Sequence, residues 1–189
     1  GFEVKEPTKK VIARTFKELL ETKSIDKITV KEIVTLCNIN RQTFYYHFYD
    51  IYDLMQWTLV EELKDLEKTY PTSVTNQDKI NLIFHRLADN KKLLMHAYSS
   101  TNHAFYRRFV KNIMNTLLED RMASYPDAVR IPEEKRIFII KIFSSALSNF
   151  ILEWIEDGMP ESYTDSISDY VEIFDIGFRG TIMKFSETK

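Results

Sequence analysis

Polar and aromatic side chains that suit a DNA groove are concentrated in one short segment, residues 41–47. On a helix with about 100° per residue, Phe44 and Phe48 lie together on one side and point inward. The outward side chains are Gln42, Thr43, Tyr45 and Tyr46, and Arg41 and His47 flank the boundary. In general Arg pairs with guanine edges, Gln with adenine and Thr with the thymine methyl group, while tyrosine hydroxyls bind phosphate oxygens. The segment therefore predicts a helix whose outer face suits the major groove.

The adjacent tyrosines also admit a structural interpretation. Tyr45 and Tyr46 would serve as packing residues if a later helix covered them, because aromatic side chains bury large apolar areas. For these two residues alone the alternatives stay open. The neighbouring segments favour the first of them.

The residues before this helix predict the support that holds it. Thr29 and Glu32 have the spacing of a capping box at the start of a short helix. The buried face of that helix comprises Val30, Ile33, Val34 and Cys37. Asn38 tolerates the left-handed conformation that ends a helix, and Asn40 is a favourable N-cap for the next one. Two short helices joined by a tight turn are typical of a helix-turn-helix.

Apolar residues at helical spacing predict further helices on both sides of this pair. A first amphipathic helix follows Pro7-Thr8, opens with a threonine cap and ends near Lys23-Ser24. A fourth helix follows Asp50 and is closed by Pro71. After a linker at 71–77, helical patterns cover 78–88, 91–98, 103–124, 132–157 and 162–186. Because no strand-like alternation separates them, the sequence predicts an all-α fold.

The helix-turn-helix segment resembles the DNA-binding motif of the TetR/AcrR family of transcriptional regulators. That motif has an I/L-T-x-x-x-I segment, a short turn and then T-F/L-Y-x-H/Y-F. Its residues stand here as Thr29, Ile33, Thr43, Phe44, Tyr45, His47 and Phe48. The resemblance covers roughly residues 8–55 and implies a homodimer that binds double-stranded operator DNA. It divides the chain into a DNA-binding domain, 1–51, and a helical regulatory and dimerisation domain, 52–189.

The resemblance also implies individual roles in DNA binding. Phosphate contacts fall to Tyr45 and His47, base edges to Arg41, Gln42 and Tyr46, and the DNA backbone to Thr29 and Lys31. The chain departs from the family pattern twice. Asn38 replaces the glycine that is usual in the turn, and Ile51 stands where many members have a lysine that contacts phosphate. The first departure is tolerable because Asn reaches left-handed angles, whereas the second removes a favourable charge.

The distribution of charge gives modest support to this assignment. Residues 1–50 hold nine basic and seven acidic side chains, a net of +2, whereas the remainder holds 17 basic and 21 acidic side chains, a net of −4. A positive bias at the DNA-binding end has the expected sign. The positive bias is small, and Ile51 lacks the family's charge. An alternative therefore stays open: a helical interaction regulator or coactivator with weakened DNA binding, controlled by a partner protein.

The C-terminal region, together with the helix-turn-helix motif, is similar to a branch of the family that includes dihydroxyacetone kinase operon activators.

The last two long helices predict a dimer interface. The helix at 132–157 is apolar on more than one side, so two of its faces need cover. The last helix has a broad apolar stripe for the core and a narrower one comprising Ile173, Ile176, Gly177 and Gly180. Two such helices from each protomer would form a four-helix interface, as the resemblance implies. The alternative is that both faces belong to the intramolecular core.

An effector pocket is predicted where aromatic residues and histidines gather in the C-terminal region. The residues are His85, Tyr98, His103, Phe105, Tyr106, Phe143, Leu147 and Phe150. They would enclose an apolar cavity of roughly 300 to 1,000 Å³ for an unknown small molecule. His96 and His103 are seven residues apart and would share a helical face if one helix ran through both, but residues 99–102 are expected to interrupt it. Isolated histidines among aromatics are more often packing or surface residues, so no metal and no cofactor are predicted.

Other classes of protein find little support in the sequence. No Ser/His/Asp or Cys/His arrangement and no glycine-rich phosphate loop appears, so an enzyme is not predicted. The single cysteine, Cys37, has no intramolecular disulfide partner, which fits a reducing compartment. No signal peptide is recognised, and no apolar run approaches the ~20 residues of a membrane span. We therefore expect a cytoplasmic protein that does not bind membranes.

Overall fold

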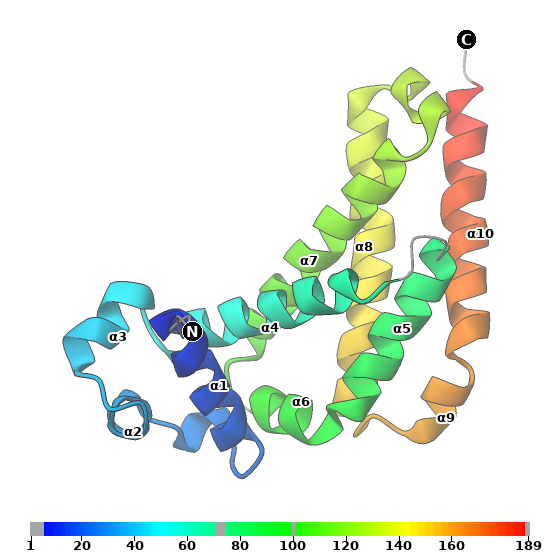
Figure 1. The fold of residues 1–189 in the computed structure, drawn as a ribbon. Coiled ribbons are helices and arrows are strands. Elements are labelled where there is room, and N and C mark those ends of the chain that lie inside the picture. Colours follow the sequence, from blue (N-terminus) through cyan, green and yellow to red (C-terminus); the bar gives the residue numbers. More distant parts are fainter. Residues whose placement is uncertain (1–5, 71–74, 100, 188–189) are drawn as a thin grey trace. The chain divides into compact units, whose positions relative to one another are not determined.

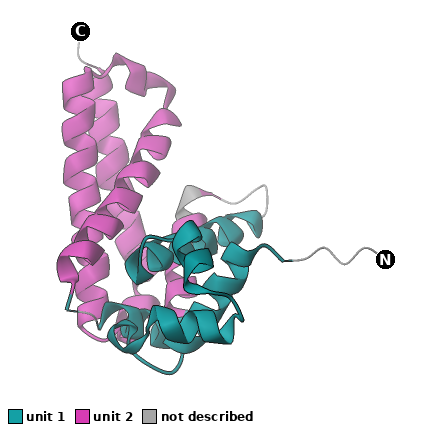
Figure 2. Ribbon diagram, turned by 90° about the vertical axis from the view of Figure 1, so that its left-hand side faces the viewer, with its two compact units in different colours: residues 1–72, 89–101 teal, residues 73–88, 102–189 magenta. Residues whose placement is uncertain are grey.

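The computed structural model describes residues 6–70, 75–99 and 101–187, and its regular elements in these ranges are all helices (Figure 1). The predicted all-α fold is confirmed. The chain forms two compact units, which Figure 2 shows in different colours. The N-terminal unit comprises Gly1–Thr72 and Asp89–Thr101, and the C-terminal unit comprises Ser73–Ala88 and Asn102–Lys189. The functional boundary between residues 51 and 52 stays a prediction.

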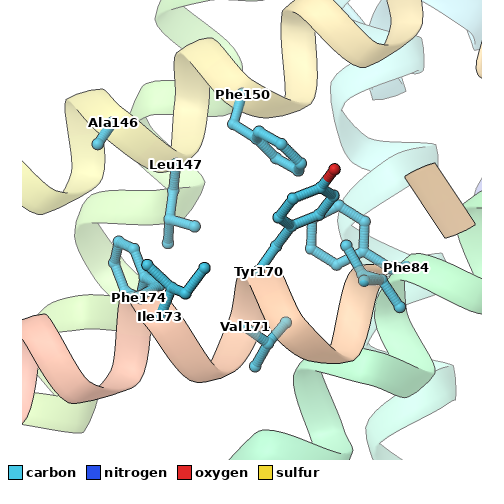
Figure 3. A pocket seen from close by; sticks show the side chains of 9 residues that line it. Phe84, Ala146, Leu147, Phe150, Tyr170, Val171, Ile173 and Phe174 are labelled. Carbon is cyan, nitrogen blue, oxygen red and sulfur yellow. The ribbon is translucent and has the colours of Figure 1, made fainter. Parts of the chain in front are cut away.

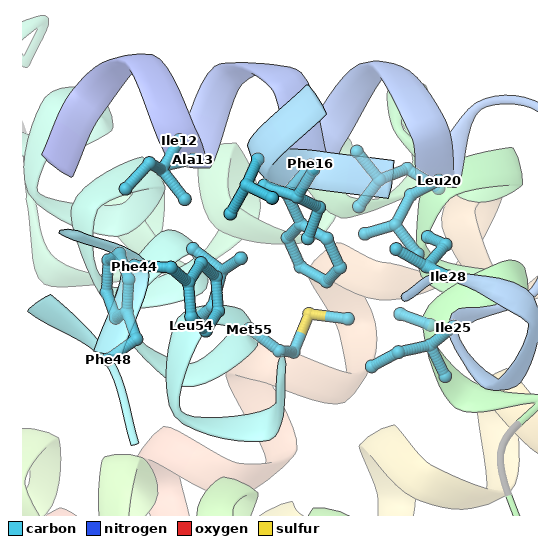
Figure 4. Close-up of a cluster of buried hydrophobic side chains, with 14 residues drawn as sticks. Ile12, Ala13, Phe16, Leu20, Ile25, Ile28, Phe44, Phe48, Leu54 and Met55 are labelled. Atoms are coloured by element: carbon cyan, nitrogen blue, oxygen red, sulfur yellow. The ribbon is translucent and has the colours of Figure 1, made fainter. Parts of the chain in front are cut away.

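The N-terminal unit is built from five α-helices and one short 3-10 helix among its described residues. They are α1 (Thr8–Leu20), the 3-10 helix Ile25–Lys27, α2 (Val30–Leu36), α3 (Arg41–His47), α4 (Ile51–Lys68) and α6 (Lys91–Tyr98). Their apolar faces converge on one core, in which Phe16, Phe44 and Phe48 are almost fully buried (Figure 4). Burial of such aromatic side chains is the main term that stabilises a small helical unit.

Helix α6 packs against α1 and the following 3-10 helix, although it comes much later in the sequence. The Nδ1 atom of His96 lies 2.5 Å from the carbonyl oxygen of Leu20, at the end of α1. The hydroxyl of Ser99 donates to the hydroxyl of Ser24, which caps the 3-10 helix that follows α1. Leu93 and Ala97 complete the apolar contact with the core. The N-terminal unit is therefore larger than the helix-turn-helix that the sequence predicts.

The C-terminal unit contains α5 (Asn76–Asp89), α7 (His103–Ala123), the 3-10 helix Pro126–Arg130, α8 (Glu133–Glu156), α9 (Glu161–Asp165) and α10 (Ile167–Ser186). Within it α7, α8 and α10 pack along one another (Figures 1 and 2). Their core includes Leu118 and Met122 of α7, Ile139 of α8, and Phe178 and Ile182 of α10. The guanidinium of Arg121 forms an ion pair with Asp175, which ties α7 to α10.

Helix α8 is long and apolar enough to cross a membrane by length and composition alone, a test that the core helix of a soluble protein also passes.

The C-terminus of α8 ends in a Schellman motif. Gly158 has φ of 84°, and the Met159 N–H donates to the carbonyl oxygen of Trp154. Glycine adopts this left-handed angle without steric cost, so the chain can turn sharply into α9.

Three predictions about where helices begin and end were wrong. Helix α1 begins at Thr8 itself, and the residue before it, Pro7, makes no side-chain cap but accepts hydrogen bonds from Lys10 and Val11 through its carbonyl oxygen. The same helix ends at Leu20, before the predicted end at 23–24. The helix predicted at 162–186 is divided at Ser166 into α9 and α10. A run of Thr, Asp and Ser residues precedes the break, and these are weak helix formers.

Candidate functional site

The outer face of α3 carries the side chains that the sequence singles out for DNA. Tyr46 is 85% exposed and Tyr45 is 52% exposed, whereas Phe44 on the opposite side is fully buried. Arg41 and Gln42 are exposed, and Thr43 and His47 are half-buried. No helix of the N-terminal unit covers the two tyrosines in the described structure, so the packing interpretation of this pair is disfavoured.

Local hydrogen bonds begin α3 in the predicted way. The Asn40 carboxamide oxygen accepts from the Thr43 backbone N–H at 2.8 Å and from the Thr43 hydroxyl at 2.9 Å. Asn40 is thus an N-cap that satisfies one of the free N–H groups at the start of the helix. The Thr43 hydroxyl is engaged in this cap. Its methyl group remains the part of the side chain suited to a thymine methyl.

The turn before α3 depends on Asn38. Its φ is 54°, and its N–H donates to the carbonyl oxygen of Thr35 while the N–H of Ile39 donates to that of Val34. These two bonds make a Schellman motif at the end of α2. Asn in place of the glycine usual in this turn therefore keeps the left-handed conformation, as the sequence predicts.

The N-terminal end of α2 carries the cation Lys31 and is capped by Thr29. Thr29 accepts a hydrogen bond from the Glu32 N–H, while the Glu32 carboxylate pairs with Lys23. Lys31 is exposed, and in the part of the chain that the structure describes neither Lys31 nor Arg41 forms an ion pair. Their charges are therefore available to an anionic partner such as a phosphate backbone.

Two further residues of the N-terminal unit, neither of them predicted as a DNA contact, are exposed in or near the helix-turn-helix. Tyr49, two residues after the end of α3, is 84% exposed, and its N–H donates to the Asp53 carboxylate. Leu36, the last residue of α2, is 60% exposed. An aromatic residue that continues the Tyr45-Tyr46 run was an available signal for Tyr49. The helical pattern does not mark Leu36, because it lies outside the predicted buried face of α2.

The lysine missing at position 51 has a structural explanation. Ile51 packs partly buried against the core of the N-terminal unit. One cation of α1 contacts aromatic rings of the same unit. The Lys9 ammonium is 4.9 Å from the ring centre of Trp57 and 5.1 Å from that of Phe48. Cations at this distance from an aromatic face are attracted by the ring quadrupole.

The predicted effector residues fall in several places, and they belong to both units. Leu147 and Phe150 line one pocket, whereas the Phe143 ring packs against Phe174 and Phe178. The other predicted members lie elsewhere: His85 and His103 are exposed, Phe105 contacts the buried Tyr106, and Tyr98 is buried in the N-terminal unit. Whether any of them contacts an effector stays a prediction.

That pocket has a volume of about 250 Å³ and lies between α5, α8 and α10 (Figure 3). The residues that line it are Phe84, Ala146, Leu147, Phe150, Ile167, Tyr170, Val171, Ile173 and Phe174. Of the five α10 residues, Ile173 belongs to the narrower stripe predicted for the dimer interface, and the other four belong to the broad stripe predicted for the core, which comprises Ile167, Tyr170, Val171, Phe174, Phe178, Ile182 and Phe185. The spacing of these residues could therefore be read from the sequence, but the presence of a cavity among them could not.

Exposed apolar side chains also gather on α8 and α10. On α10 Ile173 is 69%, Ile176 55% and Met183 58% exposed. With Gly180 they recur every three or four residues, on the side opposite the buried Phe178 and Ile182. On α8 the exposed members are Ile137, Phe138 and Ile142. A face this apolar is unusual for a monomer and indicates contact with another protein surface.

The two glycines predicted at the dimer interface differ in their surroundings. A Cβ added at Gly177 would lie 3.4 Å from the Phe143 ring of the same chain, whereas one added at Gly180 would meet nothing within 4 Å. Gly177 therefore already has a role in packing α10 on α8. Gly180 leaves the α10 surface open.

The histidines do not form a metal centre among the residues that the structure describes. No group of three or more His, Cys, Asp or Glu side chains there could hold a metal ion. His96 and His103 belong to different helices, α6 and α7, in different units. The predicted interruption between the two helices is confirmed, so His96 and His103 do not share a helical face.

Comparison with known proteins connects the C-terminal unit to a named family. Residues 75–175 match the family TetR_C_8, described as "Transcriptional regulator C-terminal region". A segment of 84 residues, 44% of the chain, is 29% identical to the HTH-type dhaKLM operon transcriptional activator DhaS of Lactococcus lactis subsp. lactis (strain IL1403). The matched segment spans 45% of the length of that relative.

A solved structure shows the same fold over nearly the whole chain. It is described as "Dihydroxyacetone kinase operon activator DhaS" and superimposes with a TM-score of 0.60 at 20% sequence identity. The match covers 94% of this chain and 97% of that one. The C-terminal family covers more than half of the present sequence, and the matched residues include all those that line the pocket described above. The chain therefore belongs to the TetR family of transcriptional regulators.

Proposed function

We propose that the protein is a sequence-specific DNA-binding regulator that reads the major groove with α3. The observation that carries the proposal is the exposed face of α3, held by the buried Phe44 and by the caps at Asn38 and Asn40. Arg41, Gln42 and Tyr46 would contact base edges. The methyl group of Thr43 would contact a thymine methyl. The predicted contacts to the DNA backbone are Thr29, Lys31, Tyr45 and His47, to which we add Tyr49. Such a protein works in the cytoplasm, where operator DNA lies.

The working form that we propose is a homodimer joined through α8 and α10. A two-fold dimer presents two copies of α3 to two half-sites, which doubles the contacts with DNA. The exposed stripe formed by Ile173, Ile176, Gly180 and Met183 supports this interface. Under this proposal residues 1–51 bind DNA, and residues 52–189 dimerise and regulate.

Control by a small-molecule effector is the form of regulation that the pocket in the C-terminal unit supports. A second candidate is a helical interaction regulator with weakened DNA binding, controlled by a partner protein. Ile51 favours it, and so do the ion pairs that Arg14, Lys17 and Lys23 form with acidic residues of the same chain. The described role of the relative, activation of the dhaKLM operon, is compatible with either form of control.

Replacing Gln42 by Ala is expected to weaken operator binding by about 1 to 3 kcal/mol. If Gln42 makes a bidentate contact with one base, its loss also relaxes the choice at that base pair. Because Gln42 is exposed, folding should not change. Fluorescence anisotropy with a duplex selected from a random pool, and with single-base variants of it, measures both effects. Equal affinity of wild type and variant for all these duplexes would exclude a base contact by Gln42.

Replacing Tyr45 by Phe removes one hydroxyl and leaves the ring that meets Phe44 edge to face at 5.3 Å. If the hydroxyl bonds a phosphate, affinity for operator and for scrambled duplexes should fall by a similar factor, about fivefold to tenfold, because phosphate contacts carry no sequence information. The same anisotropy titrations, at one salt concentration, provide the measurement. A variant that loses affinity only for the operator would instead place Tyr45 at a base.

If both Gln42→Ala and Tyr45→Phe bind operator as wild type does, α3 is not the DNA-reading element. The interaction regulator would then be the better proposal.

A further inference from the structure

The pocket between α5, α8 and α10 has walls that are almost entirely hydrocarbon. Of its nine lining residues, Tyr170 alone has a polar atom in its side chain, and none is charged. In Figure 3 the Tyr170 hydroxyl lies beside the Phe150 ring, away from the middle of the cavity. A charged molecule in this pocket would lose hydration without gaining a partner, which costs several kcal/mol. The chemistry of the walls therefore selects an uncharged occupant.

The rings that form the walls are held in place by their own neighbours. Phe150 contacts Phe84 at 6.2 Å and Tyr170 at 5.2 Å between ring centroids, both edge to face. On the other side Phe174 stacks with Phe178 at 6.3 Å and meets Phe143 at 5.3 Å. Aromatic contacts of this kind stabilise fixed ring orientations. The cavity is thus preformed, and aromatic edges and faces are its main contact surfaces.

The size of the cavity limits the ligand to one or two rings. An apolar cavity of about 150 Å³ lined by Leu, Ile and Phe accommodates benzene. At about 250 Å³ this pocket has room for a bicyclic aromatic molecule but lies below the usual range of drug-sized sites.

We propose that this pocket is the effector site and that it binds an uncharged aromatic molecule of one or two fused rings. The proposal rests on the proposed function, since it assigns the ligand class of a regulator. Ile173 lines the pocket and is also 69% exposed on the α10 stripe, so the pocket opens beside the proposed dimer interface. Regulation through this site would act where the two copies meet.

Isothermal titration calorimetry of the full chain with 2-naphthol tests the proposal, and 2-naphthoate serves as a charged analogue of the same ring size. Wild type is expected to bind one 2-naphthol per chain saturably and to bind 2-naphthoate at least tenfold more weakly. Ala146→Phe places a ring in the pocket from an exposed position of α8 and should weaken 2-naphthol binding at least tenfold. Ser145→Phe adds the same ring at the neighbouring exposed position, outside the lining, and should bind as wild type does.

Both variants are expected to keep the fold and the association of wild type, which thermal melts and light scattering check. The proposal is overturned if wild type shows no saturable binding of 2-naphthol, if Ala146→Phe binds as tightly as Ser145→Phe, or if 2-naphthoate binds equally well. Operator binding is measured on the same preparations. Wild type that binds operator but not 2-naphthol refutes the effector site alone, whereas wild type that binds 2-naphthol but no DNA refutes the proposed DNA-binding function.

Discussion

Replacement of Phe44 by Ala is expected to lower the free energy of unfolding by about 3 to 5 kcal/mol, the usual cost of truncating a buried aromatic side chain. Phe44 has no exposed surface, and its ring lies 5.9 Å from that of Phe48 in the core of the N-terminal unit (Figure 4). The cavity left by the ring adds to the lost transfer energy because the surrounding helices relax only in part. This is a large fraction of the stability of a typical domain, so DNA binding should be lost through unfolding.

The matched control is Tyr46→Ala, two residues further along the same helix. Tyr46 is 85% exposed, so its truncation should leave thermal stability nearly unchanged while it weakens DNA binding. Thermal and urea melts, followed by helical circular dichroism, measure both variants. If Phe44→Ala melts as wild type does, the inward face of α3 is not part of the core. If Tyr46→Ala is the destabilised variant, the assignment of the two faces of α3 is reversed.

Replacement of Ile176 by Arg is expected to dissociate the proposed dimer. Ile176 is 55% exposed on the stripe of α10 that faces away from the core of its own unit. In a two-fold interface the substitution occurs in both copies, and each guanidinium would be buried without a partner. Such unpaired charges cost about 3 to 5 kcal/mol, which corresponds to a dissociation constant raised at least about a hundredfold.

Light scattering at micromolar concentration measures the effect. Wild type should scatter with about twice the 22.4 kDa mass of the chain, and the variant with a mass close to that of one chain. Ser168→Arg is the control, because it adds the same charge to an exposed position of α10 outside the stripe. A wild-type mass of one chain would disprove the homodimer. Equal dissociation by both variants would show that the stripe is not the interface.

Helix α6 gives the N-terminal unit a component that a division at residue 51 does not include. His96 and Ser99 bond to the end of α1 and to the start of the following 3-10 helix, while Leu93 and Ala97 pack on the same core as Phe44. The segment Asp89–Thr101 is flanked on both sides by residues of the C-terminal unit. A displacement of α6 would therefore act on α1 through direct contacts within the N-terminal unit.

Much of the N-terminal architecture followed from the sequence because it depends on neighbours within a few residues. The cap at Asn40, the left-handed turn at Asn38 and the i, i+4 pair of Phe44 and Phe48 are local features. Their geometry is determined by backbone and side chains a turn apart, and the structure has all three as predicted. The resemblance to the TetR family rested on the same residues, and the match of the C-terminal region confirmed it.

Contacts between distant segments were decided by the tertiary structure alone. The sequence shows two apolar stripes on the last helix, but a periodic pattern looks the same whether its face is covered or exposed. The structure covers the face of Phe178 with α7 and α8 and leaves that of Ile176 uncovered. Likewise, Phe84, Leu147 and Phe174 form one pocket only because three helices far apart in sequence meet there. Side-chain packing between helices determines which apolar residues touch, and no local spacing encodes that choice.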